Sequence, residues 1–130
     1  MTEERLSLGK EGEAFAARFL KKKGYKIKER NYRSPLGEID IIATDGKTLV
    51  FVEVKTRKNK AYGIPAEAVN HRKQVQIAKT AQYYLNCKKL NDHAARIDVV
   101  SVLAEKGREM KAEVISNAFD LPFYCLLYTS

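Results

Sequence analysis

The sequence is poor in cysteine, and this scarcity excludes several classes of protein. Only Cys87 and Cys125 occur, and no CxxC pair is present. Disulfide-dependent secreted domains and structural zinc sites need more cysteines at shorter spacings. The chain also lacks an apolar run long enough to cross a membrane, and its N-terminus has no apolar core of the kind found in signal peptides. We therefore expect a cytoplasmic protein that makes no membrane contact.

Internal repeats and low-complexity segments are absent as well. A chain of 130 residues, 45% of them hydrophobic, can form one domain with its own core but is too short for two of ordinary size. We expect one domain over residues 1–119 and a tail over residues 120–130. The last six residues, "CLLYTS", match one reading frame of a common sequencing-library adapter, so we expect the end of the tail to be non-native.

Charge is biased towards the basic side. The 24 Lys and Arg residues against 16 Asp and Glu residues give a net charge of +8. This excess favours a polyanionic partner such as nucleic acid over an acidic protein. Charge alone does not establish such a partner, because many basic proteins of this size bind no nucleic acid specifically.

Hydrophobic periodicity and turn residues divide the chain into helices and strands. Ser7 is the predicted cap of the first helix and Gly24 its stop, and Asp45-Gly46 is the predicted turn of a β-hairpin. The order suits an α/β sheet with helices packed on its faces. The predicted elements are, in order, a helix over residues 7–23, a strand over 25–33, a hairpin over 37–57, a helix over 70–89, and strands over 95–104 and 111–119.

The predicted hairpin brings four charged side chains to one face of the sheet. With Asp45-Gly46 in the turn, the antiparallel register pairs Asp40 with Phe51 and Glu38 with Glu53. Side chains two residues apart on a strand share a face. The four charged residues on this face are Glu38, Asp40, Glu53 and Lys55.

Three carboxylates at this spacing repel one another. At about 5 Å and an effective dielectric of about 20, each ionised pair costs on the order of 3 kcal/mol. A bound Mg²⁺ or Mn²⁺ would offset the repulsion, since these ions prefer carboxylate oxygens. Alternatively, one carboxylate is protonated or points away, with Glu38 the first candidate. Lys55 could then hold a hydroxide or stabilise charge on a phosphate.

The same hairpin is also compatible with a solvated strand face that carries weak surface ion pairs. Against this alternative, Ile42 and Phe51 make the charged face partly apolar, and a half-buried acidic cluster is harder to explain without a function. From the spacing of the residues alone, both interpretations stay open.

Several motifs resemble a known superfamily of nucleases. Glu13, "GEID" at 37–40 and "VEVK" at 52–55 resemble the PD-(D/E)xK superfamily, which includes restriction endonucleases and archaeal Holliday-junction resolvases. The stretches "RNYRSPLGEIDIIA", "FVEVKTR", "AVNHRKQ" and "NAF" resemble, more closely, the YraN family of small bacterial proteins, over about residues 9–119. The resemblance implies a restriction-endonuclease-like fold, a mixed sheet of about five strands flanked by helices.

The resemblance also implies a role for each matching residue. Asp40 and Glu53 match the two metal-binding acids, and Lys55 matches the catalytic lysine. Val54 would offer its carbonyl oxygen to the metal, and Glu13 matches the first-helix acid that completes the site in resolvase-like members. The proline that usually precedes the first acid is missing, which makes the motif less diagnostic of activity.

Further residues could support this site. Glu38 would tune it, and Gln74 could reach it from the second helix, although Gln74 is also explained as a packing amide. Basic residues next to the hairpin are candidates for phosphate contacts, although each of them singly is also explained as a solvated charge. These basic residues are Arg33, Arg57, Lys58, Lys60, Arg72 and Lys73.

We therefore expect an Mg²⁺- or Mn²⁺-dependent phosphodiesterase that acts on DNA, with branched or repair intermediates among its possible substrates. By analogy with resolvases, a homodimer is a further expectation. One alternative is a binding or DNA-processing accessory module that keeps the nuclease fold but cleaves nothing. Another is a structural interaction domain. The intact set of two acids and a lysine favours the enzyme.

Overall fold

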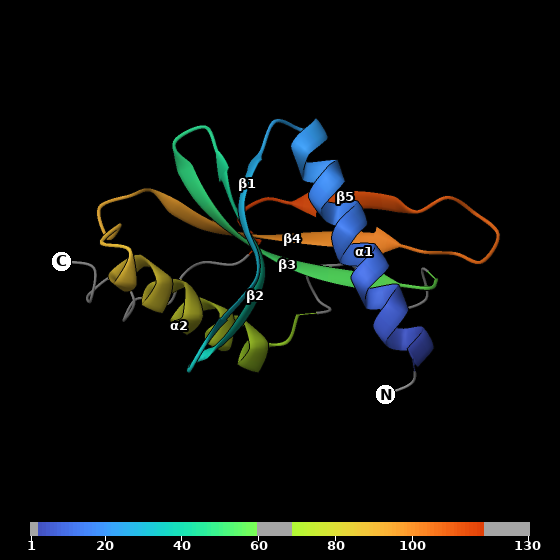
Figure 1. Cartoon of the computed structure of the whole chain (residues 1–130), viewed down its shortest axis with the longest axis horizontal. Helices are drawn as coiled ribbons and strands as arrows, with labels where there is room; N and C mark the ends of the chain where they lie inside the picture. Colours follow the sequence, from blue (N-terminus) through green and yellow to red (C-terminus); the bar gives the residue numbers. More distant parts are fainter. Residues whose placement is uncertain (1–2, 60–68, 119–130) are drawn as a thin grey trace.

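The computed structural model describes residues 3–59 and 69–118 of the chain (Figure 1). Lys60 and the tail over 120–130 lie outside the described residues. Within the described part, the predicted order of helix, three strands, helix and two strands is confirmed. The elements are α1 (Glu3–Lys22), β1 (Lys26–Ser34), β2 (Gly37–Asp45), β3 (Thr48–Arg57), α2 (His71–Cys87), β4 (Ala95–Leu103) and β5 (Lys111–Ile115).

The helix boundaries follow from local chemistry, with one correction. Gly24 lies just beyond α1 with a φ of 98°, a conformation that suits glycine and that ends the helix as predicted. Asn70 caps α2, since its side-chain oxygen accepts from the Lys73 N–H. The prediction that Ser7 caps α1 was wrong. The helix begins at Glu3, and the Ser7 hydroxyl lies 3.5 Å from a Glu11 carboxylate oxygen one turn later.

A five-stranded mixed sheet forms the centre of the fold, in the order β1-β2-β3-β4-β5 (Figure 1). Its neighbours are antiparallel except for β3 and β4, which are parallel and are joined through α2. A parallel pair needs such a crossover, because its strands enter from the same end. The expected α/β class, a sheet of about five strands flanked by helices, is therefore confirmed.

Each helix covers one face of the sheet, so the central strands are buried on both sides. On the α2 side Phe51 packs edge-to-face on Tyr84 of α2, with ring centroids 5.8 Å apart. On the α1 side Leu20 is fully buried over Val50 and Val52. This double burial explains why β3 reads as a nearly continuous apolar run. No helix in the described part of the chain has the length and apolar character needed to cross a membrane.

The hairpin register differs from the predicted one by two residues. Gly46 and Lys47 form the turn, and Asp45 already pairs with Thr48. Gly46 has a φ of 61° at the first central position, where a type II′ turn prefers glycine. The predicted pairing of Asp40 with Phe51 is therefore wrong, because Phe51 pairs with Ile42.

The same correction removes the predicted pairing of Glu38 with Glu53. An even shift does not by itself exchange the faces of the strands, but it moves every partner two residues along. The regular pairing ends at Ile41 and Val52, and the next residues on the two strands are Asp40 and Glu53, not Glu38 and Glu53. The shift thus tightens the contact between the two candidate metal-binding acids.

Gly12 of α1 sets how closely that helix approaches β3. A Cβ at this position would overlap the Thr56 hydroxyl oxygen. We expect Gly12→Ala to lower the free energy of unfolding by about 1–3 kcal/mol, the usual range for overpacking. Gly9→Ala is the matched control, because a Cβ at Gly9 meets nothing within 4 Å and alanine favours the helix. Urea denaturation measures the free energy of unfolding of both variants. Equal stabilities of Gly12→Ala and Gly9→Ala would contradict this close packing.

Candidate functional site

Asp40 lies at the centre of a group of interacting carboxylates. Its Oδ2 accepts a hydrogen bond of 2.8 Å from the Val54 N–H, so a side chain on β2 satisfies a backbone donor on β3. This bond fixes the position of Asp40 against the segment that carries Glu53 and Lys55. One oxygen of the carboxylate is thereby anchored, and the group stays half-buried.

Alternation along β2 is interrupted at Asp40. Ile39 packs in the core on the α2 side, whereas Ile41, two residues later, packs in the core on the α1 side. Next to this irregularity on β1, Asn31 has a φ of 54°. The interruption explains how Asp40 can interact with groups on both faces of the sheet.

Glu53 is the most perturbed carboxylate of this group. It is 7% exposed, and burial first, then the charge of Asp40 and a hydrogen bond with it, raise the pKa of Glu53 to about 8. The positive charges of Lys73 and Lys55 lower the pKa of Glu53 and offset part of this increase. The Lys73 Nζ lies 3.9 Å from Glu53 Oε2. Lys73, predicted as a phosphate contact, is therefore placed beside the candidate metal ligand.

Glu13 reaches the group from α1. Burial and then the Asp40 charge raise its pKa, and Arg30 of β1 lowers it. The sequence analysis did not predict Arg30 as a site residue, although an antiparallel pairing of the strands that carry Arg30 and Asp40 would have indicated it. Because β1 pairs with β2 in antiparallel fashion, Arg30 lies opposite Ile41, one residue from Asp40.

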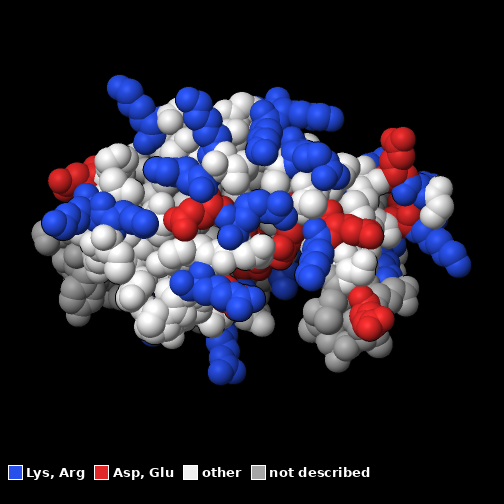
Figure 2. All heavy atoms as spheres, in the orientation of Figure 1, with Lys and Arg blue, Asp and Glu red and all other residues white. Residues whose placement is uncertain are grey.

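The remaining predicted site residues are placed further out. Glu38 is exposed, and its Oε1 lies 3.3 Å from the Arg33 Nε. Its charge is the last of the causes that raise the pKa of Glu13, so its influence on the carboxylates is small. Gln74 donates its side-chain N–H to the Val69 carbonyl oxygen at 2.8 Å and thereby holds the segment before α2. Lys58 and Arg72 are exposed and Arg57 is half-buried. In Figure 2, Lys and Arg side chains are spread over the face shown, with acidic groups between them.

The site can be tested for its fit to a divalent cation. Within the described ranges, no three Asp, Glu, His or Cys side chains form a group that could hold a metal ion by themselves. Mg²⁺ does not require such a cage, because it usually keeps several waters and binds through one or two carboxylates plus substrate phosphates. Asp40 and Glu53 are two interacting carboxylates, and cationic charge would relieve the repulsion between them. The residues present therefore fit Mg²⁺ or Mn²⁺, with Glu13 as a further acid.

The comparisons with known proteins place this chain in a family. Residues 12–102 match the model of "Uncharacterised protein family UPF0102". The chain belongs to this family. A UPF0102 protein of Geotalea daltonii is 53% identical over 117 residues, which span 90% of this chain and 92% of that relative. Another, of Syntrophus aciditrophicus, is 48% identical over 120 residues, 92% of this chain and 94% of the relative.

UPF0102 is the YraN family and belongs to the restriction-endonuclease-like superfamily. The resemblance drawn from the sequence motifs is thereby confirmed, and the mixed sheet between two helices agrees with that fold. A UPF0102 protein of Dictyoglomus thermophilum is 49% identical over 113 residues, 86% of this chain and 96% of the relative. These names describe a family and give no activity.

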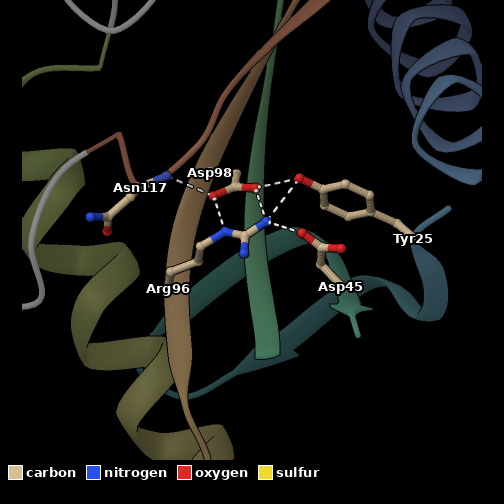
Figure 3. Close-up of polar contacts among 5 residues, drawn as sticks. All are labelled: Tyr25, Asp45, Arg96, Asp98 and Asn117. Carbon is tan, nitrogen blue, oxygen red and sulfur yellow. Dashed lines mark hydrogen bonds and ion pairs between the residues drawn. The ribbon is translucent and has the colours of Figure 1, made fainter. Parts of the chain in front are cut away.

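A second polar group, which the sequence did not predict, lies on the α1 side of the sheet (Figure 3). The Asp98 side chain is fully buried and accepts from the Tyr25 hydroxyl at 2.9 Å, the Arg96 Nε at 3.0 Å and the Asn117 N–H at 2.8 Å. Arg96 also donates to Asp45 at 2.8 Å. The group joins the starts of β1 and β4 to the end of β2 and the segment after β5, so we assign it a structural role.

The raised pKa of Glu53 predicts a pH dependence of stability. The folded value of about 8 exceeds the ordinary value of 4.5, so folding favours protonated Glu53. Its contribution is complete below the unfolded pKa and is lost as the pH rises through 8. We expect the free energy of unfolding to fall by up to about 1.4 kcal/mol per pH unit between roughly pH 5 and 8. Urea titrations in EDTA should show a flatter profile for Glu53→Gln, and identical profiles would contradict this assignment.

Proposed function

We propose that this UPF0102 protein is a metal-dependent phosphodiesterase that cleaves DNA. The observation that carries the proposal is the placement of Asp40 between Glu53 and Glu13, with Lys55 acting on the same group. A bound Mg²⁺ or Mn²⁺ would supply Lewis-acid chemistry and an activated water. Asp40 and Glu53 would hold the ion, with Glu13 and the Val54 carbonyl as further ligands.

The residues of the chain have separate tasks in this proposal. Rigid strands position Asp40, Glu53 and Lys55, which favours a reproducible geometry. The Lys55 ammonium would orient the attacking water or stabilise the charge that develops on the scissile phosphate. The net charge of +8 supports a polyanionic substrate, and exposed cations such as Arg72 and Lys58 would contact its backbone.

The experiment that tests the proposal is cleavage of labelled DNA by the full chain. Linear duplex, flapped, single-stranded and four-way-junction substrates would be incubated with Mg²⁺ or Mn²⁺, and parallel reactions would contain EDTA. The proposal expects cleavage of at least one substrate that EDTA prevents and that an excess of metal restores. Cleavage unaffected by EDTA would contradict it.

A non-catalytic binding module is the second candidate. It is favoured by the Lys73 ammonium, which lies 3.9 Å from Glu53 and already provides cationic charge there without a metal. This alternative expects no cleavage of any substrate, with salt-sensitive binding that is unchanged by Asp40→Ala or Lys55→Ala. The cleavage and binding assays together separate the two candidates.

Assembly and location complete the proposal. Two copies of the site would allow both strands of a duplex to be cut at one locus without release of the DNA, so we propose that the enzyme acts as a homodimer. We also propose that it acts in the cytoplasm. Light scattering with and without DNA tests the assembly. A monomer that cuts both strands at the same position would contradict the dimer without affecting the proposed chemistry.

A further inference from the structure

A second candidate binding site lies at the opposite end of β2 from Asp40. It is a pocket of about 400 Å³ lined by residues of the β2–β3 turn and of the segment that follows α2. Thr44, which lines the pocket, is the fourth residue after Asp40, and this is roughly 13 Å along an extended strand. The pocket is therefore separate from the carboxylate group and shares no residue with it.

A β-bulge directs Lys28 to this pocket. Ile27 pairs with Ala43 and Glu29 with Ile42, so Lys28 is an extra residue without a partner on β2. Ile27 packs on the α1 side, whereas Glu29 interacts with the Tyr84 hydroxyl of α2. The bulge therefore turns Lys28 and Glu29 to the same face, and Lys28 lines the pocket. Bulges often re-aim a side chain in this way next to functional sites.

The other walls combine an apolar floor with polar groups. Leu49 is 2% exposed, and Leu90 packs against the core on the α2 side. The wall after α2 is held by hydrogen bonds from the Leu90 N–H to the Leu85 carbonyl at 2.8 Å and from the His93 N–H to the Leu90 carbonyl at 3.0 Å. One wall of the pocket is thus held by main-chain hydrogen bonds.

The charge of the lining is positive on balance. Lys28 and Lys47 contribute two ammonium groups against the single carboxylate of Asp92, and His93 adds a ring nitrogen. Among the described residues, no carboxylate lies within ion-pairing distance of either lysine. A lysine of β1 and a lysine of the β2–β3 turn thus line the same pocket, where an anion could bridge them.

We propose that this pocket binds a nucleotide, with the phosphate on Lys28 and Lys47 and the base on the leucine floor. A simple anion would contact only the lysines. The pocket, with a volume of about 400 Å³ and an apolar floor, can also accommodate the ring of a base. Asp92 can accept a hydrogen bond from a sugar hydroxyl or an exocyclic amine. The nucleotide is either free or the end of a DNA strand, since both present the same chemistry.

Binding is measured without divalent metal, so the result does not depend on the proposed cleavage. The full chain in EDTA is titrated by calorimetry and amide NMR with AMP, adenosine and inorganic phosphate. We expect AMP to bind more tightly than either fragment and to shift amides of residues 44–49 and 90–93. Lys28→Ala and Lys47→Ala should each weaken AMP at least about fivefold, because each removes a charge-assisted contact.

Lys26→Ala is the matched control, since it removes the same charge from an exposed position on the same strand outside the pocket. It should change AMP affinity less than about twofold. Equal effects of Lys26→Ala and Lys28→Ala, or equal affinities for AMP and inorganic phosphate, would overturn the proposal, and so would no binding of AMP at millimolar concentration.

The source of the nucleotide is decided by a third arm with short single-stranded DNA, with and without a 5′-phosphate. Tighter binding of the phosphorylated strand than of AMP, weakened by Lys28→Ala, supports the pocket and assigns it to a strand end. Binding of AMP alone supports the pocket and assigns it to a free nucleotide.

Discussion

Asp40→Asn is expected to lower metal-dependent DNA cleavage by about 10² or more, the largest effect on activity that the structure predicts. The amide keeps the size of the side chain but removes the charge that would hold the metal and that interacts with both Glu53 and Glu13. A group that binds a catalytic ion stabilises the transition state by several kcal/mol, and each 1.4 kcal/mol is tenfold in rate. Single-turnover cleavage of the preferred substrate measures the loss.

Lys55→Met should produce a loss of similar size with a different signature. Calorimetric titration with Mn²⁺ should show weakened metal binding for Asp40→Asn, whereas Lys55→Met should retain it, because the lysine is proposed to act on water and phosphate and not to bind the metal. Glu113→Gln is the control for a neutralised carboxylate, since Glu113 is exposed on the edge strand β5. Loss of cleavage in the control, or full activity of Asp40→Asn, would contradict the proposed site.

Sequence patterns predicted the order of the elements because each pattern depends on local physics. The 3.6-residue period of α1 and the continuous apolar run of β3 survive in the fold, since each reflects which faces are buried. The predicted hairpin register was wrong by two residues, and the reason for this error is also local. Asp45-Gly46 is a strong turn signal, but glycine serves equally well at the first or second central position, and the pair alone does not distinguish them.

The features that the sequence did not predict depend on contacts between residues far apart in the chain. Lys73 was predicted as a candidate phosphate contact, and its approach to Glu53 depends on how α2 packs over β3. The Lys28 bulge and the pairing of β3 with β4 likewise depend on contacts between distant segments. The resemblance to nuclease motifs selected Asp40, Glu53 and Lys55 as candidates, and in the structure Asp40 and Lys55 both influence the pKa of Glu53.

Asp98→Ala is expected to have the largest effect on stability. Asp98 is fully buried and accepts from three partners, so its removal leaves the Arg96 guanidinium, 21% exposed, with part of its charge uncompensated (Figure 3). Breaking a buried ion pair from one side costs about 3–5 kcal/mol. The hydrogen bond with Asp98 is the first cause that raises the pKa of Arg96. Arginine is protonated at ordinary pH even without such a partner, so Arg96 keeps its charge after the substitution.

Urea denaturation measures this loss, and two further variants define its origin. Tyr25→Phe removes one neutral donor to Asp98 and should cost about 1 kcal/mol. Asp92→Ala is the control at an exposed aspartate and should stay within about 0.5 kcal/mol of the parent protein. A double variant with Arg96→Met and Asp98→Ala should recover part of the loss, because no buried charge is then left alone. If the double variant is no more stable than Asp98→Ala, the penalty arises from lost packing and the Asn117 contact, not from the stranded arginine.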